Sequence, residues 1–404
     1  MSEPLVIIGN GMAAARLCEE LTKRALGRYA VAVIGEEPQL AYNRVLLSSV
    51  LSGETASDDI SLRPARWWRD RGVTLQYGCA ASAIDPATHT VTLADGRTLS
   101  FARLVLATGS RPVRLPLPGA SLEGVLTFRD LADVETIARS GRNGRRVVVI
   151  GGGLLGLEAA YGLAKAGATV TLIHLMDRLM ERQLDAPAAT MLKRAVEARG
   201  IEVLLNAETA RFVGDGTVAG IELTDGRILE ADAVVVAVGI KPNAEIATAA
   251  GLQVNRGVVV DDHLATSAPN IFAIGECAEH RGTCYGLVEP AYEQARALAR
   301  HLAGEVAEYH GSAVATNLKV AGINVYSAGS FLGDATTEQI TLHDAGLDVY
   351  RKLVIEGGKL AGAVLFGDTS DGPWYLDLIR SGVSTNTFRD DLIFGRALAA
   401  SAAA

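Results

Sequence analysis

The 404-residue chain carries one pattern of strand, glycine-rich turn and helix twice, and this repeat restricts its fold more than any other feature. An apolar run at residues 5–8 leads into the motif GNGMAA at residues 9–14, and a similar run at residues 147–150 leads into GGGLLG at residues 151–156. A helical stretch rich in Ala and Leu and a second apolar strand follow each motif. Glycines in such a turn let a pyrophosphate approach the backbone, and the helix start offers it free N–H groups. The repeat therefore predicts two dinucleotide-binding units.

A second pair of repeated segments supports this architecture. Residues 91–97 and 221–227 alternate apolar and polar side chains and end in Asp-Gly-Arg, which predicts hairpins with a type I′ turn. Residues 104–109 and 234–239 follow as apolar strands that end in glycine. The predicted fold class is therefore α/β, with two Rossmann-type, three-layer dinucleotide-binding domains.

The C-terminal region has a different pattern. Residues 318–320, 350–355 and 360–366 predict strands separated by Gly-rich turns, and residues 374–379 predict a helix. We expect a small α/β interface domain here. Trp374 fits a core aromatic side chain better than a group beside a cofactor or partner.

The acid that should end the second strand of a dinucleotide-binding unit is present only once. Glu36 follows the strand at residues 30–34 and can accept hydrogen bonds from a ribose diol. His174 stands at the corresponding place in the second unit. His174, Arg178 and Arg182 could face the 2′-phosphate of NADPH, or the two arginines could be solvated. The choice between NADH and NADPH therefore stays open.

Charge and composition exclude several classes of protein. The net charge of −8 argues against binding to nucleic acid or to an anionic membrane surface. The apolar runs are too short for a membrane span, and the N-terminus does not resemble a signal peptide, so we expect a cytoplasmic protein. The four cysteines form no CxxC pair and the histidines are scattered, so we expect free cysteines and no metal site.

Two further segments resemble a known family. Residues 107–112 (ATGSRP) resemble the ATG segment, and residues 266–276 (TSAPNIFAIGE) resemble the second FAD motif, of two-dinucleotide-domain flavoprotein reductases of the glutathione reductase type. This resemblance implies FAD in the first unit and NADH or NADPH in the second. It also implies a FAD-binding domain at residues 1–112 and 240–311, an NAD(P)H-binding domain at 113–239 and a C-terminal interface domain at 312–404.

The motifs and the resemblance together give the candidate cofactor-binding residues. The set for FAD is Gly9, Gly11, Met12, Ala13, Glu36, Arg44, Ala107, Thr108, Gly109, Arg111, Gly275, Glu276 and Glu289. The set for NAD(P)H is Gly151, Gly153, Leu154, Leu155, Gly156, His174, Arg182, Val238 and Gly239.

Three of these candidates, and in addition Glu158, have specific expected roles. The resemblance implies that Glu276 binds the ribityl chain of FAD. Arg44 is expected to contact a FAD phosphate or adenine, with a surface arginine as the alternative. Glu289 opens a predicted helix at residues 291–302 whose N-terminus could stabilise negative charge on reduced flavin, or be an ordinary helix start. Glu158 is the candidate catalytic residue near the nicotinamide, with a solvated helix acid as the alternative.

The subfamily follows from local matches. Residues 42–48 and 174–185 resemble the flavoprotein portion of assimilatory NAD(P)H nitrite reductase large subunits. Rubredoxin and ferredoxin reductases are the next resemblance, although Ser49 replaces the Lys of that group. Only Cys18 lies where the disulfide reductases carry a CxxxxC pair, so we expect no redox-active disulfide.

The expected function is electron transfer from NAD(P)H through FAD to a redox protein acceptor. The chain ends in an Ala/Ser tail at residues 399–404 rather than in iron–sulfur and sirohaem segments, so a separate component of nitrate or nitrite reduction is the expected acceptor. Rubredoxin or another small iron–sulfur protein is the alternative acceptor. A non-catalytic flavin-binding module is the alternative from another class. The sequence allows a monomer or a homodimer.

Overall fold

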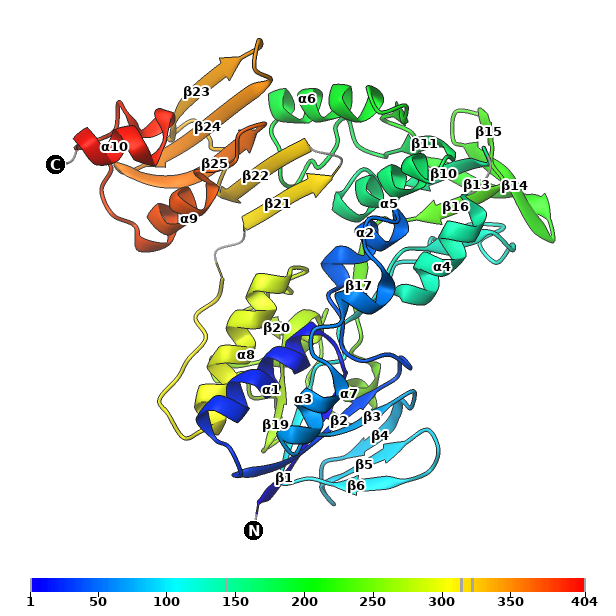
Figure 1. Ribbon diagram of the computed structural model, residues 1–404, viewed down its shortest axis with the longest axis vertical. Helices are drawn as coiled ribbons and strands as arrows, with labels where there is room; N and C mark the ends of the chain where they lie inside the picture. The colour runs from blue at the N-terminus through cyan, green and yellow to red at the C-terminus, as the bar shows by residue number, and fades with distance from the viewer. Residues whose placement is uncertain (1, 142–143, 313–314, 321–322, 403–404) are drawn as a thin grey trace. The chain divides into compact units, whose positions relative to one another are not determined.

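The computed structural model describes residues 2–141, 144–312, 315–320 and 323–402, and the last two residues of the Ala/Ser tail lie outside these ranges. The chain forms two compact units. The first comprises Met1–Leu47, Thr55–Pro112 and Ile240–Ser312, and the second comprises Ser48–Glu54, Val113–Gly239 and Ala313–Ala404. Each unit contains a five-stranded parallel sheet, which confirms the predicted α/β fold class (Figure 1). The division into three domains stays a prediction.

The first unit is built around a sheet with the strand order β19-β7-β1-β2-β3. Its apolar strands are buried on both faces, as parallel sheets covered by helices require. Helices α1 and α8 pack against each other and lie side by side in Figure 1. The sheet and these helices are β1 (Glu3–Ile8), β2 (Tyr29–Gly35), β3 (Thr74–Tyr77), β7 (Arg103–Leu106), β19 (Ile271–Ala273), α1 (Met12–Arg24) and α8 (Val288–Leu302).

Shorter elements complete this part of the chain. A three-stranded meander of β4, β5 and β6 and two-stranded pairs β8–β17 and β18–β20 flank the main sheet. Their bounds, with those of the small helices, are η1 (Arg44–Leu46), η2 (Ser57–Ile60), α3 (Ala65–Asp70), β4 (Ala81–Asp85), β5 (Thr90–Leu93), β6 (Thr98–Ser100), β8 (Ser110–Pro112), β17 (Ile240–Pro242), α7 (Glu245–Ala249), β18 (Val258–Val260), η3 (Gly275–Cys277) and β20 (Ala278–His280). Helix α2 (Leu47–Leu51) lies between η1 and η2 in the sequence and belongs, except for Leu47, to the second unit.

The second unit repeats the same sheet, with the order β12-β11-β10-β16-β9 and a meander of β13, β14 and β15. In both sheets the strand before the glycine-rich turn lies in the centre, and the chain leaves it toward one side and later returns on the other. Ligands of open α/β sheets bind at this switch point, at the carboxyl ends of the strands. The elements are β9 (Val125–Thr127), α4 (Leu131–Ser140), β10 (Arg146–Ile150), α5 (Leu154–Lys165), β11 (Thr169–Ile173), α6 (Ala186–Glu197), β12 (Glu202–Leu204), β13 (Thr209–Asp215), β14 (Thr217–Leu223), β15 (Ile228–Glu230) and β16 (Ala233–Val236).

The two predicted hairpins form, but the predicted turn type is wrong. Gly96 has a positive φ of 87°, whereas Asp95 does not, and a type I′ turn needs two consecutive positive φ angles. The Gly96 amide donates to the Leu93 carbonyl, and the Asp95 carboxylate accepts from the Arg97 amide at 3.0 Å. Residues 223–227 repeat these contacts. Both loops are therefore three-residue hairpin loops that end in a left-handed glycine.

The C-terminal region forms a five-stranded antiparallel sheet with the order β21-β22-β25-β24-β23 (Figure 1). The three predicted strands lie within β21, β24 and β25, and the predicted helix lies within α9, where Trp374 packs against the core. Sequence reasoning missed β22 and β23. The bounds are β21 (Ala315–Val320), β22 (Ile323–Gly329), β23 (Glu338–Asp344), β24 (Val349–Glu356), β25 (Lys359–Phe366), α9 (Gly372–Ser381), η4 (Leu392–Phe394) and α10 (Arg396–Ala402).

A buried polar cluster connects this sheet to the start of helix α6 in the second unit. The side chain of Asp185 caps α6 by accepting from the Ala188 amide at 3.2 Å. It also accepts a 2.6 Å hydrogen bond from the Tyr350 hydroxyl and lies 3.7 Å from the ammonium of Lys352, both on β24. All three clustered side chains are buried.

Among the described residues, the helices are too short or too polar to cross a membrane.

Candidate functional site

The first glycine-rich turn lies between β1 and α1, and its backbone requires glycine. Gly9 has a φ of 114°, and a Cβ atom there would overlap the carbonyl oxygen of Ala107 on the neighbouring return strand. A Cβ atom at Gly11 would meet nothing within 4 Å. Gly11 caps α1 without a side-chain hydrogen bond, and the first turn, which starts with Met12 and Ala13, contains no acid. The turn therefore leaves N–H groups and open space for a phosphate.

The second turn, between β10 and α5, has the same construction. Gly151 has a φ of 122° and approaches the carbonyl of Ala237, while Gly153 caps the helix and faces open space. A Cβ atom at Gly156 would overlap the carbonyl oxygen of Gly151, so glycine lets helix and strand pack closely. Leu154 and Leu155 begin the helix, and its first turn also lacks an acid. Both turns thus fit the pyrophosphate of a dinucleotide.

The second FAD motif lies against the first turn. Gly275 has a φ of 79°, and a Cβ atom there would lie 3.1 Å from the Cβ of Ala13. The Gly275 amide donates to the Oε1 atom of the fully buried Gln294 at 2.7 Å. Ser110 donates to Glu276 at 2.7 Å. Sequence reasoning missed Gln294 and Ser110, although a glutamine on the apolar face of α8 was a detectable signal.

The ATG segment is held by its own partners. The Thr108 hydroxyl donates to the Asn243 carbonyl at 2.6 Å, and the Asn243 side chain donates back to the Thr108 carbonyl at 3.0 Å. Gly109 has a φ of 67°. The guanidinium of Arg111 binds the side chains of Asn243 and Glu245. Arg111, on β8 where this strand pairs with β17, therefore has partners within the protein.

The acids near the end of β2 differ in their surroundings. Glu36 follows the strand directly and is exposed, as a ribose ligand requires. Glu37 accepts from the Tyr42 hydroxyl at 2.6 Å and pairs with Arg44. Arg44 also lies over the Tyr42 ring, with its Cζ atom 4.9 Å from the centroid. The structure thus places Arg44 in a Glu37–Tyr42 cluster, which differs from the alternative of a surface arginine, and the contact with FAD stays a prediction.

At the end of β11, both ring nitrogens of His174 have protein partners. Its Nδ1 atom accepts from the Gly152 amide at 3.0 Å, and its Nε2 atom lies 3.0 Å from Glu181 Oε2. Both nitrogens are thus engaged by protein groups, and the choice between NADH and NADPH stays a prediction. Arg178 pairs with Asp177 at 3.0 Å. The side chain of Arg182 is 86% exposed and lies 3.8 Å from Glu181.

The remaining candidates lie at helix starts and strand ends. Burial raises the pKa of Glu158, on α5, to about 7, and this carboxyl has no ion-pair partner among the described residues. Helix α8 begins at Val288, three residues before its predicted start, and Glu289 in its first turn pairs with Arg296 at 3.0 Å. Val238 is exposed, and Gly239 has a φ of 126° with open space beside it.

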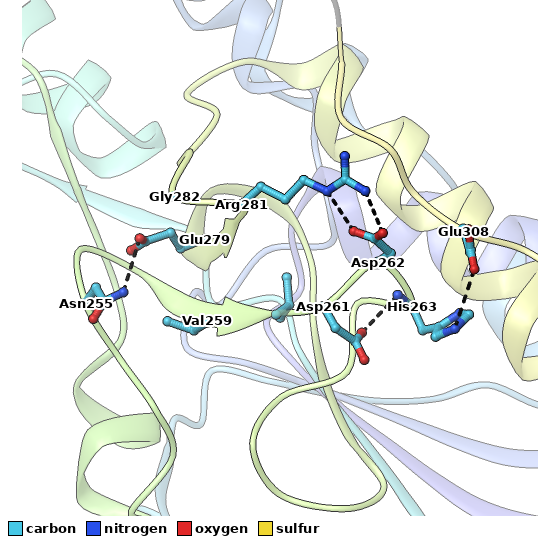
Figure 2. Close-up of a pocket in the computed structure, with 10 residues that line it drawn as sticks. Asn255, Val259, Asp261, Asp262, His263, Glu279, Arg281, Gly282 and Glu308 are labelled. Atoms are coloured by element: carbon cyan, nitrogen blue, oxygen red, sulfur yellow. Dashed lines mark hydrogen bonds and ion pairs between the residues drawn. The ribbon is translucent and has the colours of Figure 1, made fainter.

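A surface hollow of about 520 Å³ in the first unit lies among residues outside the predicted cofactor set. Figure 2 shows Arg281 bound to Asp262 there through two contacts, of 2.9 and 2.6 Å. Asp262, Glu308 and His310 are close enough to share a cation. Arg281 and His280 already engage the Asp262 carboxylate, and hydrogen bonds from Arg281 hold its pKa well below the usual range. We assign no metal site to this hollow.

All four cysteines are free. Cys18 and Cys277 are buried, and burial raises the pKa of Cys18 to about 12. A thiol with such a pKa is a poor nucleophile at neutral pH. Cys18 and Cys277 therefore pack as small apolar side chains of the core.

Comparison with known proteins finds relatives that match most of the chain. Residues 3–297 match the pyridine nucleotide-disulphide oxidoreductase family, and residues 315–383 match the rubredoxin NAD+ reductase C-terminal domain. In Bacillus subtilis, a nitrite reductase [NAD(P)H] is 44% identical over 93% of this chain and 47% of its own length. An assimilatory nitrate reductase electron transfer subunit of the same organism is 45% identical over 92% of this chain and 48% of its own length. The chain thus spans about half the length of these curated relatives.

A solved structure agrees along the full length of the chain. The covalent putidaredoxin reductase–putidaredoxin complex contains a chain that superimposes with a TM-score of 0.88 at 28% identity, covering 100% of this chain and 99% of that one. The family match covers both glycine-rich turns and the second FAD motif. The protein therefore belongs to the pyridine nucleotide-disulphide oxidoreductase family.

Proposed function

We propose that this protein takes electrons from a nicotinamide dinucleotide and passes them through FAD to a redox protein of nitrate or nitrite reduction in the cytoplasm. One observation carries the proposal: two glycine-rich turns of the same construction lie at the switch points of two separate sheets. A chain that only stored flavin would need one such turn. The similarity to an electron transfer subunit of assimilatory nitrate reductase supports the choice of acceptor.

The first unit would hold FAD. Gly9 and Gly11 would receive the pyrophosphate, Glu36 the adenosine ribose, and Glu276 the ribityl chain. Gln294 would orient this last contact, because it fixes the Gly275 amide beside the first turn. When bound, FAD would accept a hydride and release electrons singly, which nicotinamide alone does not do. We assign residues 1–112 and 240–311 to this FAD-binding domain.

The second unit would hold the nicotinamide dinucleotide, in a domain at residues 113–239. Gly151, Gly153 and Gly156 would accommodate the pyrophosphate at the start of α5. Glu158, one turn into this helix, would present its carboxyl near the nicotinamide end, and burial raises the pKa of this carboxyl to about 7. In its ionised form it would stabilise the positive charge that develops on the nicotinamide ring as the hydride departs.

The C-terminal domain at residues 312–404 would take part in acceptor binding. Its similarity to the rubredoxin NAD+ reductase C-terminal domain supports a second candidate acceptor, a rubredoxin or another small iron–sulfur protein. All four cysteines are free, so electrons would pass from the flavin to the partner protein without a disulfide as intermediate.

The acceptor is tested with the reduced holoenzyme. A nitrate or nitrite reductase component and a rubredoxin are each mixed anaerobically with the reduced protein, and reoxidation of the flavin is followed. We expect faster reoxidation with the nitrate or nitrite reductase component. A preference for rubredoxin would favour the second acceptor, and a flavin that neither nicotinamide dinucleotide reduces would indicate a non-catalytic flavin-binding module.

A further inference from the structure

The end of β11 lacks an acid in the sequence, but the fold returns one to this place. His174 follows the strand directly, and its Nε2 atom lies 3.0 Å from Oε2 of Glu181. Its Nδ1 atom accepts from the Gly152 amide, so the proton of the neutral ring lies on Nε2. His174 therefore donates to Glu181 and connects this carboxylate to the glycine-rich turn.

The segment that carries Glu181 is anchored independently of any ligand. Leu179 and Met180 are fully buried, and Met180 has a φ of 49°, in the left-handed region. The Met180 amide donates to the Gly152 carbonyl at 3.0 Å. A Cβ atom at Gly152 would lie 2.7 Å from both His174 and Leu179, so these groups are closely packed. Glu181 follows Met180 directly, so its backbone is held in place by the same contacts.

The carboxylate has capacity for another partner. Oε2 accepts from His174, and among the described residues the ion-pair contact of Oε1 is Arg182 Nε at 3.8 Å, which exceeds hydrogen-bonding distance. The Glu181 side chain is 22% exposed, so solvent or a ligand can reach it. An ionised carboxylate accepts about four hydrogen bonds, and most of this capacity is open here.

We propose that Glu181, positioned by His174, binds the adenosine ribose diol and makes the second unit select NADH over NADPH. This inference rests on the proposed function and names the nucleotide that this site takes. A carboxylate accepts hydrogen bonds from the 2′- and 3′-hydroxyls of NADH, whereas it repels the 2′-phosphate of NADPH.

The neighbouring arginines, which would favour NADPH, have less influence than the Glu181 carboxylate. Arg178 pairs with Asp177 at 3.0 Å, which neutralises its charge locally. Arg182 is largely solvated, and an exposed, flexible guanidinium binds a phosphate weakly in the absence of further partners. The fixed carboxylate therefore determines the selectivity.

The test measures nucleotide binding and flavin reduction separately, on the FAD-loaded protein. Dissociation constants for NAD+ and NADP+ are measured by calorimetry, and flavin reduction by NADH and NADPH is measured by anaerobic stopped flow. Glu181→Gln keeps the shape of the side chain and its contact with His174 but removes the charge. We expect the NAD+/NADP+ affinity ratio to fall about tenfold or more, in line with loss of a charge-assisted hydrogen bond and a repulsion.

Glu135→Gln is the matched control, because it makes the same change on an exposed side chain of α4 in the same unit. It should change the affinity ratio less than about twofold. The inference would be overturned if the NAD+/NADP+ affinity ratio were unchanged in Glu181→Gln, or changed equally in both variants. It would also be overturned if the wild type preferred NADP+ and Arg182→Gln abolished that preference.

A separate outcome bears on the proposed function. If the wild-type protein binds NAD+ but NADH does not reduce its flavin, the proposed function is refuted, while the selectivity of Glu181 is still supported.

Discussion

Replacement of Asp185 by alanine is expected to destabilise the second unit by about 3–5 kcal/mol, because it removes one partner from a buried ion pair. Asp185 and Lys352 both have side chains that are 8% exposed, and they lie 3.7 Å apart. Among the described residues, the Lys352 ammonium would keep only the Leu332 carbonyl, at 3.0 Å, as a partner. The variant would also lose the cap of α6, which contributes about 1 kcal/mol.

Two further variants divide this effect. Tyr350→Phe removes only the 2.6 Å hydrogen bond to Asp185, and a hydrogen bond to a charged group contributes about 1.5–3 kcal/mol. Asp185→Asn keeps an oxygen that can cap α6 and accept from Tyr350, so its loss should be smaller than that of Asp185→Ala. The free energy of unfolding is measured by urea denaturation followed by circular dichroism.

The reasoning would be refuted if Asp185→Ala lost less than about 1 kcal/mol, which is the range of a solvent-exposed pair. Equal losses in Asp185→Ala and Asp185→Asn would contradict the cap and the Tyr350 contact specifically. Additive effects of Asp185→Ala and Tyr350→Phe in the double variant would also contradict it, because contacting residues should couple.

Three other changes have distinct expected results. Gly153→Ala places a methyl group in the open space beside the second turn. The free energy of unfolding should change by less than about 1 kcal/mol, and FAD should be retained, while flavin reduction by NADH slows on the order of 10–100-fold. Equal rates of flavin reduction in the variant and the wild type would contradict this prediction. Gly9→Ala should instead lower the melting temperature, because the added Cβ overlaps the Ala107 carbonyl and φ is 114°; an unchanged melting temperature would argue against this geometry. Burial raises the pKa of Glu158 from 4.5 to about 7. The contribution of its protonated carboxyl to folding stability is therefore complete below pH 4.5 and is lost as the pH rises through 7. Glu158→Gln should therefore match wild type near pH 4.5 and have the higher melting temperature at pH 8, and the reverse order at pH 8 would refute the burial argument.

The repeated architecture could be predicted because its signals are local. Residues 9–14 and 151–156 carry glycines at the positions where backbone atoms approach closely, and an apolar strand precedes each motif. The register of such a unit follows from parallel pairing of short, fully apolar strands. By contrast, β22 and β23 were missed because their residues mix polar and apolar side chains, and their pairing depends on strands distant in the sequence.

The side-chain partners at the site could not be predicted. Arg44 is seven residues from Glu37 in the sequence, and only the fold of the intervening loop brings their side chains together. A 2′-phosphate beside His174 was one alternative that stayed open, and no sequence signal indicated that the left-handed backbone at Met180 turns the following segment back and places Glu181 on the ring. A positive φ in a non-glycine residue is uncommon and carries little sequence signal. The type of the hairpin turns was mistaken for a different reason, since an Asp-Gly pair fits more than one turn type.

The central claim is tested most directly by anaerobic titration of the FAD-loaded protein with NADH and, separately, with NADPH, while the flavin absorbance near ~450 nm is followed. The account predicts stoichiometric bleaching by NADH, and slower or weaker bleaching by NADPH. A flavin band that neither nucleotide bleaches, or a purified protein that binds no FAD, would contradict the account.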